Sequence, residues 1–214
     1  NFGSRDVRGT FSGPLVAGQL GVSGALRYGQ REGYTRNRIT GNDVDSREAV
    51  TGKGQLLWTP SSLWETRFIV SGERARDGDY ALSDLGGLLT SQFEIARDFE
   101  GRTHRDILAT TVLARRAGGR LNLTSTTGIV RWHTEDVTDL DYTPAPLVRR
   151  ENAEESAQFT QELRVASAAN APLRLSDRVP LKWQAGVFAF VQSYEQDAVN
   201  AYSPFVLSPQ LPLA

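Results

Sequence analysis

The sequence predicts an all-β protein: part of an antiparallel transmembrane β-barrel meander, with about eight strands of a larger barrel forming an open curved sheet. Three observations predict this class. Apolar and polar residues alternate with a period of two in eight short segments, as in strands with two different faces. The connections between these segments alternate between shorter and longer. No window approaches the about 18 to 20 consecutive apolar residues of a membrane helix, so a membrane-spanning role requires strands.

The clearest pair of strands lies in residues 53–74, on either side of a turn predicted at residues 59–62. Pro60 favours a turn there because its φ is fixed. Trp58 and Trp64 flank this turn on the apolar face. A soluble sandwich would bury that face, whereas a barrel would place it in lipid with the tryptophans at the membrane interface. The alternation alone is compatible with both.

The other segments follow the same pattern in chain order. Strands are expected at residues 5–12, 20–30, 53–59, 64–74, 106–115, 121–133, 159–167 and 181–194. The long polar connections are residues 31–48, 75–103 and 134–155, and the short turns are residues 13–18, 59–62 and 117–119. The connection at residues 168–180 is longer than the other short turns. Outer-membrane barrels place their short turns in the periplasm and their long loops outside the cell, so the alternation favours the barrel.

The period-two pattern also assigns side chains to faces. The residues expected to point outward, away from the concave side, are Val22, Leu26, Trp58, Trp64, Phe68, Val70, Trp183 and Val187. In the last segment Phe188 and Phe190 fall on the polar face and break the alternation, and Gln161 falls on the apolar face of its own segment.

Composition excludes several function classes. The 24 Lys and Arg residues balance 25 Asp and Glu residues, so the chain gives no sign of a nucleic-acid partner. There is no Cys, which excludes disulfides, thiolate metal sites and a cysteine nucleophile. There is also no Met and no visible signal peptide, and we therefore expect the 214 residues to be a fragment.

Six runs of sequence resemble segments of one known family, in that family's order. They are residues 7–15 (VRGTFSGPL), 31–37 (REGYTRN), 55–60 (QLLWTP), 77–82 (DGDYAL), 161–167 (QELRVAS) and 183–190 (WQAGVFAF). Together they resemble the barrel of TonB-dependent outer-membrane receptors. The resemblance implies a barrel of about 22 strands closed around a plug. Residues 1–214 would then be part of the barrel domain, about a third of it, with the plug domain and the remaining strands absent.

The resemblance also implies location, activity and partners. Such receptors lie in the bacterial outer membrane, contact the lipid bilayer and take up a scarce small-molecule nutrient, typically a ferric siderophore, with energy from TonB transmitted through the plug. Iron chelate, cobalamin and carbohydrate are not distinguished by this sequence. Two other classes stay open: a passive porin-like channel or small outer-membrane enzyme, and a soluble antiparallel β-protein that serves as a binding module.

Candidate binding residues fall into two groups. In the first long connection an aromatic ring and two guanidinium groups would suit an anionic chelate, although simple solvation is the alternative; these residues are Tyr34, Arg36 and Arg38. The polar face of the strands would line the lumen and contact the plug or the ligand, through Arg27, Lys53, Glu65, Arg67, Glu162, Arg164 and Gln184.

No catalytic, cofactor or metal site is predicted, and the chain is expected not to be an enzyme. His104 and His133 have no metal-ligand spacing and no nucleophile partner. Four acidic residues lie close together in the third long connection and could suggest a calcium loop: Glu135, Asp136, Asp139 and Asp141. The glycine and the spacing of an EF-hand are missing there, so a solvated acidic loop is expected.

Overall fold

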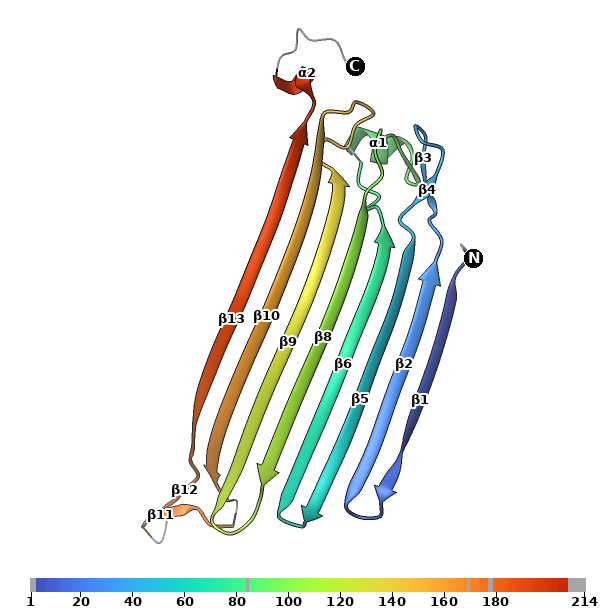
Figure 1. The fold of residues 1–214 in the computed structure, drawn as a ribbon. Coiled ribbons are helices and arrows are strands. Elements are labelled where there is room, and N and C mark those ends of the chain that lie inside the picture. The colour runs from blue at the N-terminus through green and yellow to red at the C-terminus, as the bar shows by residue number, and fades with distance from the viewer. Residues whose placement is uncertain (1–2, 84, 169, 177–178, 208–214) are drawn as a thin grey trace.

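One eight-stranded antiparallel sheet makes up most of the protein (Figure 1). The computed structural model describes residues 3–207 except 84, 169 and 177–178. Its long strands are β1 (Arg5–Val16), β2 (Leu20–Arg31), β5 (Arg47–Ser61), β6 (Trp64–Gly78), β8 (Arg102–Arg116), β9 (Leu121–Asp139), β10 (Val148–Ser167) and β13 (Gln184–Tyr202). Each pairs with its neighbours in chain order, and within the described residues β1 pairs only with β2 and β13 only with β10. The predicted open eight-stranded meander is confirmed.

The remaining elements are short. A three-stranded sheet in the order β4-β3-β7 is formed by β3 (Thr35–Asn37), β4 (Asp43–Val44) and β7 (Glu94–Ile95). A small hairpin consists of β11 (Leu173–Ser176) and β12 (Val179–Leu181). The helices are α1 (Leu85–Thr90) and α2 (Pro204–Leu207). In the described part of the chain, neither helix has the length and hydrophobicity needed to cross a membrane.

The connections divide between the two ends of the sheet as the sequence predicts (Figure 1). One end carries the long connections, residues 32–46, 79–101 and 140–147. The other end carries residues 17–19, 62–63 and 117–120, together with the segment that contains β11 and β12. We call the first end the loop end and the second the turn end.

Several predicted boundaries were wrong, mostly because the strands extend further toward the loop end. The connection predicted at residues 134–155 shrinks to 140–147, since β9 continues to Asp139 and β10 starts at Val148. Both faces are polar in these extensions, so the alternation that identifies a strand is missing. At the turn end β1 continues to Val16, and Pro60 lies inside β5, next to an irregularity in register between Trp58 and Ser61.

One face of the sheet is apolar along most of its width. Cross-strand partners lie on the same face of a sheet, and Leu56, Phe68 and Val112 are successive partners on neighbouring strands. All the residues predicted to share the outward face do share it by register, with Trp183 just before β13. Large exposed side chains on this face are Val7, Leu26, Phe68, Leu108, Ile129, Phe159, Leu163, Val187 and Val191. We call this surface the apolar face.

Two boundaries limit the apolar face along the strands. Trp58 and Trp64 lie at the turn end. Toward the loop end the face becomes charged in a row of successive cross-strand partners, which we call the charged row: Arg74, Asp106, His133, Glu155 and Glu195. On β6 the stretch from Trp64 to Gly72 measures about 27 Å at about 3.4 Å per residue. This is comparable to the about 25 Å apolar band of outer-membrane barrels.

Gln161 is a polar side chain that the sequence placed on the apolar face. Its Oε1 accepts a hydrogen bond from Thr127 Oγ1 at 2.6 Å, and its Nε2 donates to Ser125 Oγ at 3.1 Å. The amide is therefore satisfied by the neighbouring strand β9, which removes most of the cost of placing it among apolar side chains. The opposite, polar face carries Phe188 and Phe190, as predicted, across from Glu162 and Thr160.

Candidate functional site

The loop end is the best candidate site, because its three long connections contact one another. Strand β3 of the first connection pairs in parallel with β7 of the second, through Arg36 with Glu94 and Asn37 with Ile95. The buried apolar side chains of the described chain are few, and Val44, Ile95 and Val137 among them lie at this end. We call residues 32–46, 79–101 and 140–147 the loop assembly.

Asn37 joins the first two connections through its side-chain amide. Its Nδ2 donates to the Arg97 carbonyl oxygen at 2.9 Å and to Glu100 Oε1 at 3.1 Å, and its Oδ1 accepts from the Arg97 backbone N–H at 3.1 Å. The side chain is fully buried. Every hydrogen-bonding function of this amide is thus used within the loop assembly, which is the condition for burying it at low cost.

Arg97 forms an ion pair with Asp79 inside the second connection. Their Nη2 and Oδ2 atoms are 2.8 Å apart, and the two side chains are 0% and 1% exposed. Asp79 Oδ2 also accepts the Gly101 backbone N–H at 2.7 Å, and Arg97 Nη2 donates to the Tyr80 carbonyl at 2.6 Å. The Arg97 guanidinium lies 5.9 Å from the centre of the Tyr142 ring, which belongs to the third connection. Arg97 therefore contacts all parts of the loop assembly.

The three candidate ligand-binding residues lie on one side of β3. Thr35 and Asn37 are buried, whereas Tyr34, Arg36 and Arg38 alternate with them and are exposed. Arg36 pairs with Asp43 at 3.3 Å, and Arg38 lies 3.9 Å from Glu94. The Tyr34 ring has the Arg31 guanidinium at 4.4 Å from its centre. Carboxylates of the loop assembly therefore already balance both arginines, and an anionic ligand would have to compete with them.

The seven candidate lumen residues also share a face. Cross-strand pairing places Arg27, Lys53, Glu65, Arg67, Glu162, Arg164 and Gln184 on the polar face. Three of them take part in two ion pairs: Arg27 pairs with Asp6 at 2.7 Å, and Arg67 pairs with Glu65 at 2.9 Å. The same face carries a pair that sequence reasoning missed, Arg105 with Glu73 at 2.6 Å.

The histidines take part in no catalytic arrangement among the described residues. His133 belongs to the charged row, and its two ring nitrogens lie 3.2 Å from Glu135 and 3.2 Å from Glu155. His104 lies 3.9 Å from Glu135. In the described residues the carboxylates next to these rings belong to Glu135 and Glu155.

Sequence reasoning missed Asn37, Asp79 and Arg97. The only available signal was that Asn37 and Asp79 fall within runs that resemble receptor segments. Burial of a charged side chain depends on the packing of distant loops, and a single sequence does not contain it as a local pattern.

Comparison with known structures defines the fold class. The sheet has the same fold as part of an uptake receptor of known structure. One similar structure is the ferric yersiniabactin uptake receptor FyuA from Yersinia pestis, with a TM-score of 0.74 and 18% sequence identity over 94% of this chain and 30% of FyuA. A copper transporter, OprC, matches with a TM-score of 0.26 and 10% identity over 91% of this chain and 42% of OprC. No protein-family model matches the chain. The chain thus spans about 30% of the length of FyuA.

Proposed function

We propose that this chain is part of the barrel wall of an outer-membrane receptor that takes up a small-molecule nutrient with energy from TonB. The observation that carries the proposal is the shared architecture with FyuA along 94% of the chain. The apolar face supports this proposal. Tryptophans lie at one end of the face and charged residues at the other, and no described part of the chain covers the face. We assign the apolar face to lipid, the polar face to the lumen and plug, and the loop end to the outside of the cell.

A ferric siderophore is the nutrient that we propose. The support is the similarity to FyuA, which is itself a ferric yersiniabactin uptake receptor. The cationic and aromatic side of β3, with Tyr34, Arg36 and Arg38, would contribute to the entry of an anionic chelate. The residues of the polar face, which include Arg27 and Arg67, would pair with the plug. Neither role is enzymatic.

Uptake of iron in cells tests the proposal. The full-length protein would be expressed in bacteria that lack their own siderophore receptors, and uptake of radioactive iron from a panel of ferric siderophores would be measured with and without TonB. We expect uptake of at least one chelate that disappears in the strain without TonB. Equal uptake in both strains, with general permeability to small solutes, would favour a passive channel. Recovery of the protein in the soluble fraction without detergent would favour the soluble binding module.

A further inference from the structure

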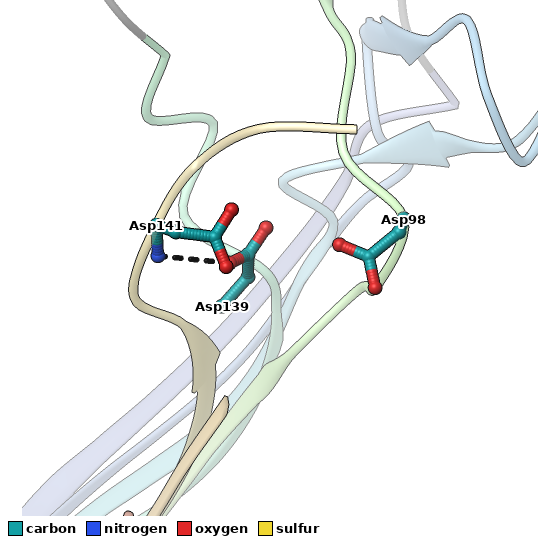
Figure 2. Close-up of side chains that lie close together, drawn as sticks. All are labelled: Asp98, Asp139 and Asp141. Atoms are coloured by element: carbon teal, nitrogen blue, oxygen red, sulfur yellow. Dashed lines mark hydrogen bonds between the residues drawn. The ribbon is translucent and has the colours of Figure 1, made fainter. Parts of the chain in front are cut away.

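Three carboxylates from two separate segments meet at the loop end (Figure 2). Asp98 belongs to the second connection, Asp139 ends β9 and Asp141 follows two residues later. One oxygen atom from each lies within 4.8 Å of the others. Calcium binds oxygen at about 2.3 to 2.6 Å, so two ligands on opposite sides of one ion are about 5 Å apart. The spacing of the three oxygens therefore fits a single ion of this size.

Asp139 provides an independent reason to expect a ligand. The residue is 1% exposed. Its Oδ1 accepts the backbone N–H groups of Asp141 at 3.0 Å and Tyr142 at 3.2 Å. Its Oδ2 is buried and has no hydrogen-bond partner in the described chain. In Figure 2 this second oxygen points into the space between Asp141 and Asp98. Burying a carboxylate oxygen without a hydrogen-bond donor costs free energy unless a cation or another donor binds it.

The three carboxylates line one cavity of about 290 Å³, together with Phe99, Leu147 and Arg149. The cavity gives an ion and its water ligands room to enter. No ion pair to any of the three carboxylates exists in the described chain, because the nearby guanidinium groups bind elsewhere. Arg97 pairs with Asp79 at 2.8 Å, and Arg149 pairs with Glu151 at 2.6 Å. Within the described residues, the cluster therefore holds three acidic groups that form no ion pair with a basic side chain.

The electrostatics of the cluster agree with this charge imbalance. Asp139 lies beyond the charged row and so outside the apolar face. Burial, together with the charge of Asp141, raises the pKa of the Asp139 carboxyl to about 6. Burial likewise raises the pKa of Asp98. Burial would also raise the pKa of Asp141, but hydrogen bonds from Thr143 and Val148 keep it below its usual value. The negative charges of the three carboxylates repel one another when they are ionised together.

We propose that Asp98, Asp139 and Asp141 bind a calcium ion that holds the second connection against the end of β9. Three hard oxygen donors, with no His or Cys among them, suit Ca²⁺ better than Zn²⁺ or Cu²⁺. The remaining ligands would be water molecules and backbone carbonyl groups. Because Asp98 follows Arg97 directly, the ion would stabilise the loop assembly that Arg97 joins. The sequence predicted a solvated acidic loop here, because the glycine and the spacing of an EF-hand are missing. Asp98 was not among the acids of that loop, since it lies far from Asp139 along the chain.

Calcium binding to the purified full-length protein tests this proposal. The protein would be refolded into detergent free of lipopolysaccharide, which itself binds divalent ions, and depleted of metal with a chelator. Isothermal titration with Ca²⁺ would give the affinity, and limited proteolysis of residues 79–101 with and without Ca²⁺ would report on the loop assembly. We expect one saturable site and slower cleavage with Ca²⁺. The assay uses neither nutrient nor TonB, so it can fail without affecting the proposed function.

Matched variants locate the site. Asp139→Asn and Asp98→Asn keep the side-chain shape and remove the charge, and each should weaken Ca²⁺ binding at least tenfold. Asp43→Asn is the control, because Asp43 is an exposed acid of the loop assembly that pairs with Arg36 outside the cluster. Its affinity should equal that of the wild type. Heat-modifiability on gels would confirm that each variant forms the barrel. Absence of saturable binding in the wild type, or equal binding by all variants, would overturn the proposal.

Discussion

The Nη2 atom of Arg97 lies 2.8 Å from Oδ2 of Asp79, and both side chains are almost completely removed from solvent. This ion pair is the most buried one in the described chain, and it lies in a long connection rather than in the sheet. Its loss would leave a buried charge without a partner. The connections at the loop end therefore form an ordered structure with its own small interior, in which β3, β7 and Asn37 take part.

Replacing Arg97 by Met should open the loop assembly without disrupting the sheet. Breaking a buried ion pair by removing one partner typically costs about 3 to 5 kcal/mol. The cost should appear locally, because the strands keep their own ladder of hydrogen bonds. Limited proteolysis of residues 79–101 in the full-length protein would measure it. Arg38→Met, at a side chain that is 65% exposed, is the matched control and should leave cleavage unchanged. Equal protection of both variants would show that the pair contributes little.

The sheet could be predicted because its two faces meet different surroundings. Where one face is apolar, as around Leu56 and Phe68, the alternation is visible in the sequence and gives both the strands and their faces. Where both faces are polar, as in β9 beyond His133, the alternation disappears and the strand was assigned to a loop. The conformation there comes from pairing with β8 and β10, which continues the ladder already formed.

The loop assembly could not be predicted in the same way. Arg97 and Asp98 are adjacent in sequence, yet one is buried against Asp79 and the other faces Asp139. Neither placement follows from a local pattern. The predicted residues Tyr34, Arg36 and Arg38 do fall on one side of β3, because a three-residue strand alternates its side chains. What escaped prediction is the set of acids that already pair with the two arginines.

Phe68→Arg tests whether the apolar face lies in lipid. Phe68 is 44% exposed and lies midway between Trp64 and Gly72 on the apolar face of β6. An arginine on the lipid-facing side near the bilayer midplane costs about 2 to 4 kcal/mol. Unfolding of the full-length protein by denaturant in lipid vesicles would measure the loss. Gln55→Arg is the control, because Gln55 lies on the polar face of the neighbouring strand β5 and should tolerate the charge. A greater loss for Gln55→Arg than for Phe68→Arg would reverse the assignment of the two faces.

The pKa of Asp139, raised to about 6, predicts how calcium binding depends on pH. Without a cation, burial disfavours the ionised form, so this group's contribution to stability is greatest below its unfolded pKa and is lost as pH rises through about 6. Ca²⁺ binds the ionised form of Asp139, so its contribution to stability should increase as the pH rises. Its apparent affinity should fall about tenfold between about pH 7.5 and about pH 5, because a proton replaces the ion. Titration calorimetry at both values would measure this. An affinity that stays constant over this range would exclude Asp139 as a ligand.

Under the proposed function, the second long connection is part of the ligand entrance. Residues 83–91 can be replaced by a short Gly-Ser linker that removes α1 but keeps Asp79, Arg97 and β7. Loops tolerate changes of length far better than the strands that support them, so the barrel should assemble normally. If the loop end faces outward and receives the nutrient, the shortened receptor should bind and take up its ligand less well. Binding to whole cells, uptake and heat-modifiability on gels would be compared with the wild type.

One outcome would contradict the role of residues 83–91 in ligand binding, and another would contradict the orientation of the sheet in the membrane. Normal affinity and uptake in a correctly assembled variant would remove residues 83–91 from the binding site while leaving the orientation intact. Cleavage of residues 79–101 by a protease that acts only from the periplasmic side would reverse the orientation of the whole sheet, because all three long connections lie at the same end. A protease site inserted at residues 62–63 provides the matched control at the turn end. It should be cut only from the periplasm, since the turn end is opposite the loop assembly (Figure 1).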